Sequence, residues 1–114
     1  MRIIIVCVVV STFSALAFAN QGHLLLLSQT RDERATTIAG ILHTSKKACE
    51  AVSRTFLQGT DQDEASYWNA ECTDGASYVI QLTTTNQTRV IECEVVEDIM
   101  KRTGNGRPCF TRFE

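Results

Sequence analysis

The alternation of apolar and polar residues is clearest between Tyr67 and Cys93, where it predicts three antiparallel strands. Residues 67–72, 76–82 and 89–93 alternate with the period of two that is typical of strands. Asp74-Gly75 joins the first two and suits the positive φ angles of a hairpin turn. One face carries the apolar residues Trp68, Ala70, Cys72, Tyr78, Ile80, Leu82, Ile91, Cys93 and Val95. We expect this face to pack against a helix and the opposite face to meet water.

The pattern before these strands has a helical period. An amphipathic helix is predicted from about residue 44 to residue 58, because four apolar side chains fall on one stripe: Ala48, Cys49, Val52 and Phe56. Thr44 or Ser45 is the expected N-cap. Gly59 stands where a helix C-cap is expected.

A second helical period follows the third strand. Val96, Ile99 and Met100 recur at the spacing i, i+3 and i+4 and predict a short helix. A glycine-containing turn then leads to an extended tail that carries Cys109. The predicted fold is α+β: an amphipathic helix packed on a three-stranded antiparallel meander, then a short C-terminal helix and a tail. Residues 44–114 make up this domain.

Residues 20–43 are expected to form an N-terminal arm or a loosely docked helix. Apolar residues at helical spacing place a helix from about Arg31 to Leu42, although Gly40 weakens it by about 1 kcal/mol relative to alanine. A run of four leucines precedes it: Leu24, Leu25, Leu26 and Leu27. Because four exposed leucines in a row are unusual, this run either packs on the domain or binds a partner.

The first nineteen residues are typical of a secretory signal peptide. Arg2 precedes an apolar run from Ile3 to Val10, and Ala17-Phe18-Ala19 is a small-residue cleavage site. An uncleaved anchor stays as the alternative, because residues 3–19 number 17 (19 − 3 + 1), the lower limit of a membrane-spanning helix. Cleavage leaves 95 residues (114 − 19), one small domain with no membrane span. The expected location is the periplasm or the exterior.

The charge of the cleaved chain argues against two classes of partner. Loss of Arg2 leaves 10 basic residues (11 − 1) against 13 acidic ones, a net charge of −3. A mildly acidic chain with no block of like charge is not typical of a protein that binds nucleic acid or an anionic membrane surface.

Four cysteines remain after cleavage, and an even number in an exported chain predicts two disulfides. Their spacings of 23, 21 and 16 residues lack the close pairs of a zinc site. Cys72 and Cys93 end the two outer strands, about 9 to 10 Å apart, which is too far for a disulfide. The preferred pairs are Cys49 with Cys72 and Cys93 with Cys109. Cys49 with Cys93 and Cys72 with Cys109 is the alternative.

The sequence offers little that points to catalysis. His23 and His43 are the two histidines, and no local motif gives either one a nucleophile and an orienting group. The acidic run at residues 61–64 lacks the glycine and the distal glutamate of a calcium loop. There is no C-x-x-C for redox exchange. We therefore predict no catalytic residue, no metal and no cofactor.

A tyrosine on the face expected to meet water is the better candidate for recognition. Tyr67 shares that face with Asn69, Glu71 and Gln81, and aromatic residues on polar surfaces are typical of interfaces. These four residues and the run Leu24 to Leu27 form the predicted interaction surface. The favoured function is an exported, non-enzymatic interaction module, an adaptor or inhibitor-like protein that binds another protein of the envelope or exterior. The alternative is an accessory hydrolase or redox protein whose site is assembled from distant residues.

Residues 68–110 resemble small exported proteins of proteobacteria that carry a Cys-x-Asp-Gly-x-x-Tyr element and two later cysteines. Here the element runs from Cys72 to Tyr78, and the later cysteines are Cys93 and Cys109. The resemblance implies export but no activity. The order of helix and three strands is also similar to PepSY-like periplasmic modules, a likeness of fold that implies no function. It is similar to double-stranded RNA-binding domains too, against which the export signal, the disulfides and the acidic charge argue.

Overall fold

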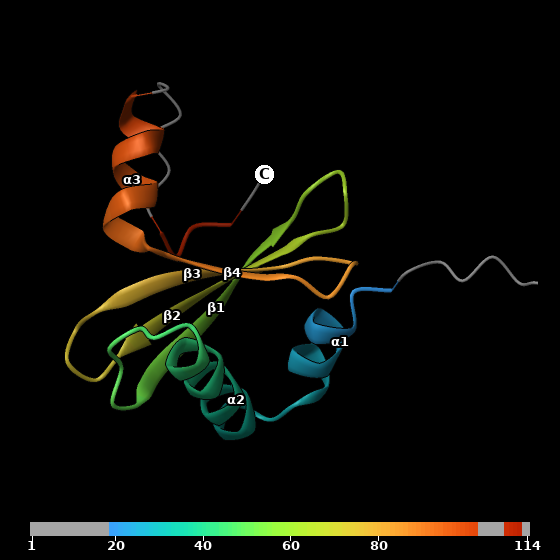
Figure 1. Cartoon of the computed structure of the whole chain (residues 1–114), viewed down its shortest axis with the longest axis horizontal. Coiled ribbons are helices and arrows are strands. Elements are labelled where there is room, and N and C mark those ends of the chain that lie inside the picture. The colour runs from blue at the N-terminus through green and yellow to red at the C-terminus, as the bar shows by residue number, and fades with distance from the viewer. Residues whose placement is uncertain (1–18, 103–108, 113–114) are drawn as a thin grey trace, which may run out of the picture.

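The computed structural model describes residues 19–102 and 109–112. The elements in this part of the chain are α1 (Gln21–Ser28), α2 (Arg31–Thr44), β1 (Val52–Thr60), β2 (Ser66–Cys72), β3 (Ser77–Leu82), β4 (Thr88–Glu92) and α3 (Cys93–Arg102). The four strands form one antiparallel sheet in the order β1-β2-β3-β4. Helices α1 and α2 lie on one side of this sheet and α3 lies on the other (Figure 1). The fold is therefore α+β, as predicted.

The predicted helix over residues 44–58 is wrong, because its second half belongs to strand β1, and the sheet therefore has four strands rather than three. Ser45 is the C-cap of α2 rather than the N-cap of a following helix. The chain leaves α2 through Lys46, whose φ of 58° is left-handed. The amide of Lys47 donates to the Leu42 carbonyl oxygen at 2.9 Å, which closes the turn. Beyond this turn, pairing with β2 satisfies the backbone of β1.

Helices α1 and α2 contribute directly to the core. The expected helix from Arg31 is present, and Thr30 caps it in a capping box with Glu33. Leu26, Ile38 and Leu42 are 0–1% exposed and pack in one cluster with the buried side of the sheet. These contacts dock both helices on the sheet through a few buried side chains, while the rest of residues 20–43 is largely at the surface.

The sheet separates two apolar clusters. The side that faces α1 and α2 buries the predicted residues of the first two meander strands: Trp68, Ala70, Cys72, Tyr78, Ile80 and Leu82. On the other side, Val79 is buried with Cys93 and Cys109, and Val96 and Phe110 pack against them. The expectation that this second side meets water is therefore wrong, because α3 and the tail cover part of it.

The predicted phase of β4 is also wrong. Ile91 pairs with Val79 on the α3 side of the sheet, whereas Val90 pairs with Ile80 and belongs to the other cluster. The strand ends at Glu92 and α3 begins at the next residue, so Cys93 and Val95 are helical. The alternation of apolar residues continues through Cys93 and Val95 in the sequence, but the strand ends where the helix begins.

Each apolar cluster contains one disulfide. Cys49 is joined to Cys72 and Cys93 to Cys109, with Cα atoms 5.5 Å and 6.0 Å apart, and these are the pairs preferred from the sequence. The first bridge lies in the α1 and α2 cluster and the second in the α3 cluster. The two bridges therefore fasten opposite sides of the sheet.

Two predictions fall wholly or mainly outside the described residues. They are the signal peptide, of which the structure describes Ala19 alone, and the glycine-containing turn after α3. Among the residues that the structure does describe, no helix is both long enough and apolar enough to cross a membrane.

Candidate binding groove between helix α3 and the sheet

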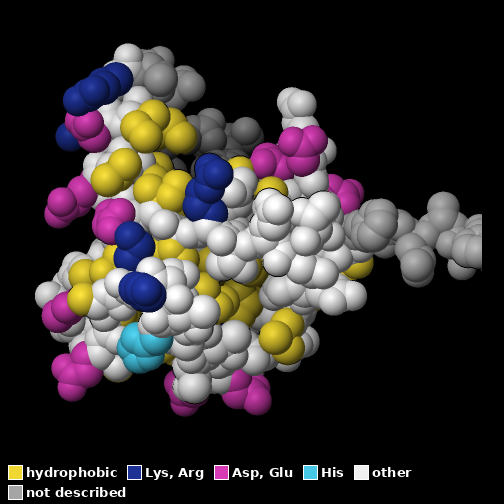
Figure 2. Space-filling model, viewed as in Figure 1, with side chains coloured by type: hydrophobic (Ala, Val, Ile, Leu, Met, Phe, Trp, Pro, Cys, Tyr) yellow, Lys and Arg dark blue, Asp and Glu magenta, His cyan; other side chains and the backbone are white. Residues whose placement is uncertain are grey.

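An apolar groove with a volume of about 330 Å³ lies between α3 and the sheet. Residues from all four strands, from the loop between β1 and β2 and from α3 line it: Gln58, Asp61, Tyr67, Val79, Ile91, Val96, Ile99 and Met100. Apolar side chains gather over α3 on the surface as well (Figure 2). We refer to this feature as the α3 groove.

The direction of α3 creates the groove. The helix starts at the end of β4, and the disulfide from Cys93 to Cys109 fastens its first turn. From there it projects away from the sheet (Figure 1). Val96, one turn into the helix, is half-buried, whereas Ile99, a turn further on, is 52% exposed. The apolar stripe of α3 is thus only partly covered, with Ile99 its most exposed member.

One end of the groove is polar. The hydroxyl of Tyr67 donates to Oδ2 of Asp61 at 2.7 Å, and Nε2 of Gln81 donates to the Tyr67 oxygen at 3.0 Å. The other carboxylate oxygen, Oδ1, accepts from the backbone amides of Asp63 and Ala65 at 2.9 Å and 3.0 Å. A carboxylate therefore sits in a fixed position beside an apolar surface.

The protonation states of this pair follow from their contacts. The hydrogen bond from Tyr67, with the two amide bonds, holds the pKa of Asp61 below its ordinary value, so the carboxylate is charged at neutral pH. Burial and then the bond to Asp61 raise the pKa of Tyr67, so its hydroxyl stays protonated and donates. The polar end of the groove therefore carries the negative charge of the Asp61 carboxylate at neutral pH.

The four predicted recognition residues of the sheet do not stay together. Tyr67 lines the groove, and Gln81 donates a hydrogen bond to the Tyr67 hydroxyl. Asn69 is fully buried, and its Oδ1 accepts from the amide of Phe110 at 2.7 Å, so its predicted exposure is wrong because the tail covers it. Glu71 pairs with Arg54 at 3.4 Å, away from the groove.

The leucine run divides between the core and the surface. Leu26 is 1% exposed, whereas Leu24, Leu25 and Leu27 are 53%, 51% and 48% exposed. They lie on α1, across the sheet from α3 (Figure 1). This second predicted surface is therefore separate from the groove.

Both histidines have a role in packing. Nδ1 of His23 accepts from the indole Nε1–H of Trp68 at 3.0 Å. The ring Nε2 of His43 contacts the carbonyl oxygen of Cys49 beside the first disulfide. Within the described residues, no three histidine, cysteine or acidic side chains are grouped so that they could hold a metal ion.

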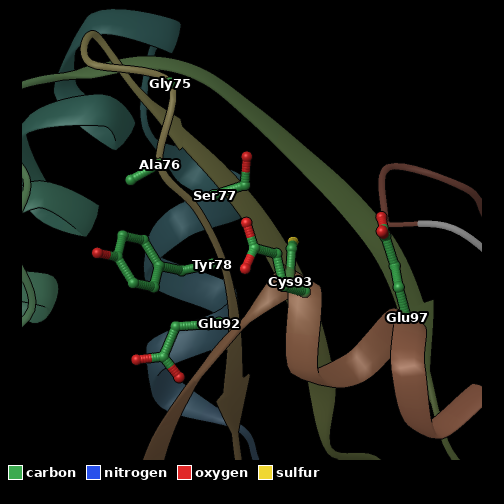
Figure 3. Close-up of a pocket in the computed structure, with 8 residues that line it drawn as sticks. Gly75, Ala76, Ser77, Tyr78, Glu92, Cys93 and Glu97 are labelled. Carbon is green, nitrogen blue, oxygen red and sulfur yellow. The ribbon is translucent and has the colours of Figure 1, made fainter.

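A second hollow, of about 280 Å³, lies at the start of α3 and is polar (Figure 3). Two of its polar side chains are engaged in structural contacts: Glu92 pairs with Lys47 at 2.7 Å, and the hydroxyl of Tyr78 donates to the Ala48 carbonyl oxygen at 2.8 Å. Glu97 accepts from the amide of Cys109 at 3.3 Å. Figure 3 shows Tyr78 and Glu92 pointing away from Glu97. The hollow therefore lacks the convergent polar groups of a reactive site.

Sequence reasoning identified Tyr67 but not the groove beside it. Val96, Ile99 and Met100 were expected to form a helix face, yet no surface was assigned to that face. One signal was present: Val79 is an apolar residue between Ser77 and Gln81 on the sheet face expected to meet water. Its cross-strand partner Ile91 extends that apolar spot in the folded sheet.

Comparison of the chain with protein-family models, with curated proteins and with solved structures finds no match. The α3 groove is therefore interpreted from its own shape and chemistry.

Proposed function

We propose that this protein is an exported, non-enzymatic interaction module that binds another protein of the envelope or exterior through the α3 groove. The observation that carries the proposal is the groove itself, an apolar depression that crosses the sheet beneath an exposed helix. Concave apolar surfaces with a few fixed polar groups are the usual form of binding sites. Two disulfides support export, because disulfides persist in oxidising compartments.

The chemistry of the groove favours binding over catalysis. Its polar end is a carboxylate and a phenol held to each other, and Gln81 holds the phenol from the other side. His23 is bonded to Trp68 on the opposite side of the sheet, and His43 contacts the backbone beside the first disulfide. The exposed part of α3 offers a partner apolar area that water solvates poorly.

Site-specific cross-linking in cells that naturally make the protein tests the proposal. A photoreactive amino acid replaces Ile99, which lines the groove, or Val95, which lies on the same helix at 46% exposure but does not line it. We expect a discrete adduct with a second protein from position 99 and none from position 95. Equal labelling from both positions, or no adduct from position 99, would contradict a binding role for the groove.

The location is tested separately. We expect the protein outside the cytoplasm with an N-terminus at Asn20, as measured by fractionation and by mass spectrometry of the intact protein. A chain that keeps residues 1–19 would point to the anchored alternative. A chain found in the cytoplasm would contradict export.

A further inference from the structure

We propose that the α3 groove recognises an extended segment of its partner in which a lysine or arginine is next to apolar residues. The basic group lies at the Asp61 and Tyr67 end, and the apolar residues lie along Val96, Ile99 and Met100. This inference rests on the proposed function and specifies the chemistry of the partner.

The size of the groove matches a short extended segment. It is lined from β1 at Gln58 to β4 at Ile91, a crossing of three inter-strand spacings. At about 4.8 Å each, this distance is about 14 Å. An extended chain advances about 3.3 Å per residue, so about four residues cover the groove. A segment of this length places one residue at the polar end and the next ones against α3.

The charge at the polar end selects a cation. The carboxylate of Asp61 is followed in the same loop by Asp63 and Glu64, so negative charge accumulates there. The ion pairs of the described residues join Lys47 to Glu92, Arg54 to Glu71 and Arg102 to Asp98, and none of them neutralises Asp61. A basic residue of the partner would be attracted to this end, whereas an acidic one would be repelled.

Asp61 also has the hydrogen-bonding capacity to receive that cation. A carboxylate accepts about four hydrogen bonds. Oδ1 accepts from two backbone amides and Oδ2 accepts from Tyr67, which leaves one acceptor position on Oδ2. Because these three bonds fix the carboxylate before a partner arrives, little further ordering is needed when a basic group binds.

Selection from a phage-displayed library of random peptides of about seven residues tests the inference directly. The bait is the exported protein with both disulfides formed, and Ile99→Asp serves for counter-selection with Val95→Asp as its matched control. We expect the enriched peptides to contain a lysine or arginine beside at least two apolar residues. Their binding should be lost with Ile99→Asp and kept with Val95→Asp.

The role of the charge is tested with a second matched pair. Asp61→Asn should weaken binding of the enriched peptides by about fivefold, as expected for one partly exposed ion pair. Asp63→Asn removes the same charge two residues away, at a position that does not line the groove, and should weaken binding less than Asp61→Asn does. A third comparison needs no variant of the protein. Raising the salt concentration from about 50 mM to about 500 mM should weaken binding of a basic peptide, but not binding of the same peptide with glutamine in place of its basic residue.

Three results would overturn the inference. They are enrichment of acidic or uncharged peptides, binding that survives Ile99→Asp, and no enrichment that depends on the groove. A discrete adduct from position 99 together with uncharged peptides would leave the proposed function intact and remove only the preference for a cation. The absence of both the adduct and the peptides would remove both proposals.

Discussion

The indole Nε1–H of Trp68 donates to Nδ1 of His23 at 3.0 Å, and this bond exists only while that nitrogen of His23 is unprotonated. Burial lowers the pKa of His23 below its ordinary value of 6.5, which favours the neutral ring. The guanidinium of Arg34 lies 5.0 Å from the centre of the Trp68 ring, so protonation would add a second cation to the same indole. The contact between α1 and the sheet is therefore sensitive to pH.

We expect the free energy of unfolding to fall as the pH drops below 6.5. The folded-state pKa of His23 is depressed, so the unfolded chain takes up the proton first, and the loss levels off once His23 is protonated in the folded protein as well. Asp61 and Glu92, whose pKa values are lowered from 3.8 and 4.5, lose their contribution only at more acidic pH. The measurement is urea unfolding at several pH values between about 8 and about 5.

The single tryptophan makes this measurement specific, because the fluorescence of Trp68 reports on the contact itself. His23→Gln should reduce the dependence on pH. His43→Gln, which removes the other histidine, should retain it. An unchanged dependence in His23→Gln would mean that the bond to Trp68 is not what responds to pH.

Neighbouring leucines on α1 should differ sharply in their effect on stability. Leu26→Ala leaves a cavity in a cluster that includes Ile38 and Leu42, and should lower the free energy of unfolding by about 2 to 5 kcal/mol. Leu25→Ala, at 51% exposure, should change it by less than about 0.5 kcal/mol. Urea denaturation of the two variants makes the comparison. Similar small effects would show that α1 does not dock on the domain in solution.

Removal of each disulfide should affect a different side of the sheet. Replacement of both cysteines of a bridge by serine should cost about 3 kcal/mol, since the bridges join residues 16 and 23 positions apart. Without the Cys93 to Cys109 bridge, amide hydrogen exchange should speed up most in α3. Without the Cys49 to Cys72 bridge, it should speed up most at the end of α2 and the start of β1. The same exchange pattern in both variants would contradict two separate clusters.

The parts of the fold that depend on local pattern were predictable. Apolar residues recur with a period of two on the buried face of β2 and β3, and Gly75 provides the φ of 92° that their turn needs. The amide of Gly75 donates to the Cys72 carbonyl oxygen at 2.9 Å, which closes the turn. The spacing of strands in a sheet excluded the pair Cys72 with Cys93 and left two pairings open, of which the preferred one is present.

Strand β1 was missed because its alternation is interrupted. The register with β2 shifts between Val52 and Arg54 and again between Leu57 and Gly59, where Gly59 has a φ of 147°. Such irregularities displace apolar residues from the period of two. In this segment the displaced apolar residues match the spacing of a helical stripe instead. The pairing with β2 decided the structure of this segment, and that pairing is a tertiary contact.

The groove could not be predicted from the sequence, because it also depends on tertiary contacts. Its lining residues belong to separate strands and to α3, and their proximity depends on the angle at which α3 leaves β4. Tyr67 was identified from its chemistry alone. Its partner Asp61 was considered only as part of a calcium loop, because the hydrogen bond between them forms in the folded chain.

The position of β3 between two apolar clusters has a consequence for the fidelity of folding. Ile80 faces one cluster and Val79 the other, and Tyr78 and Leu82 follow the phase of Ile80. A slip of this strand by one residue would send every side chain to the wrong face at once. The two hydrophobic clusters together therefore fix the register of this strand.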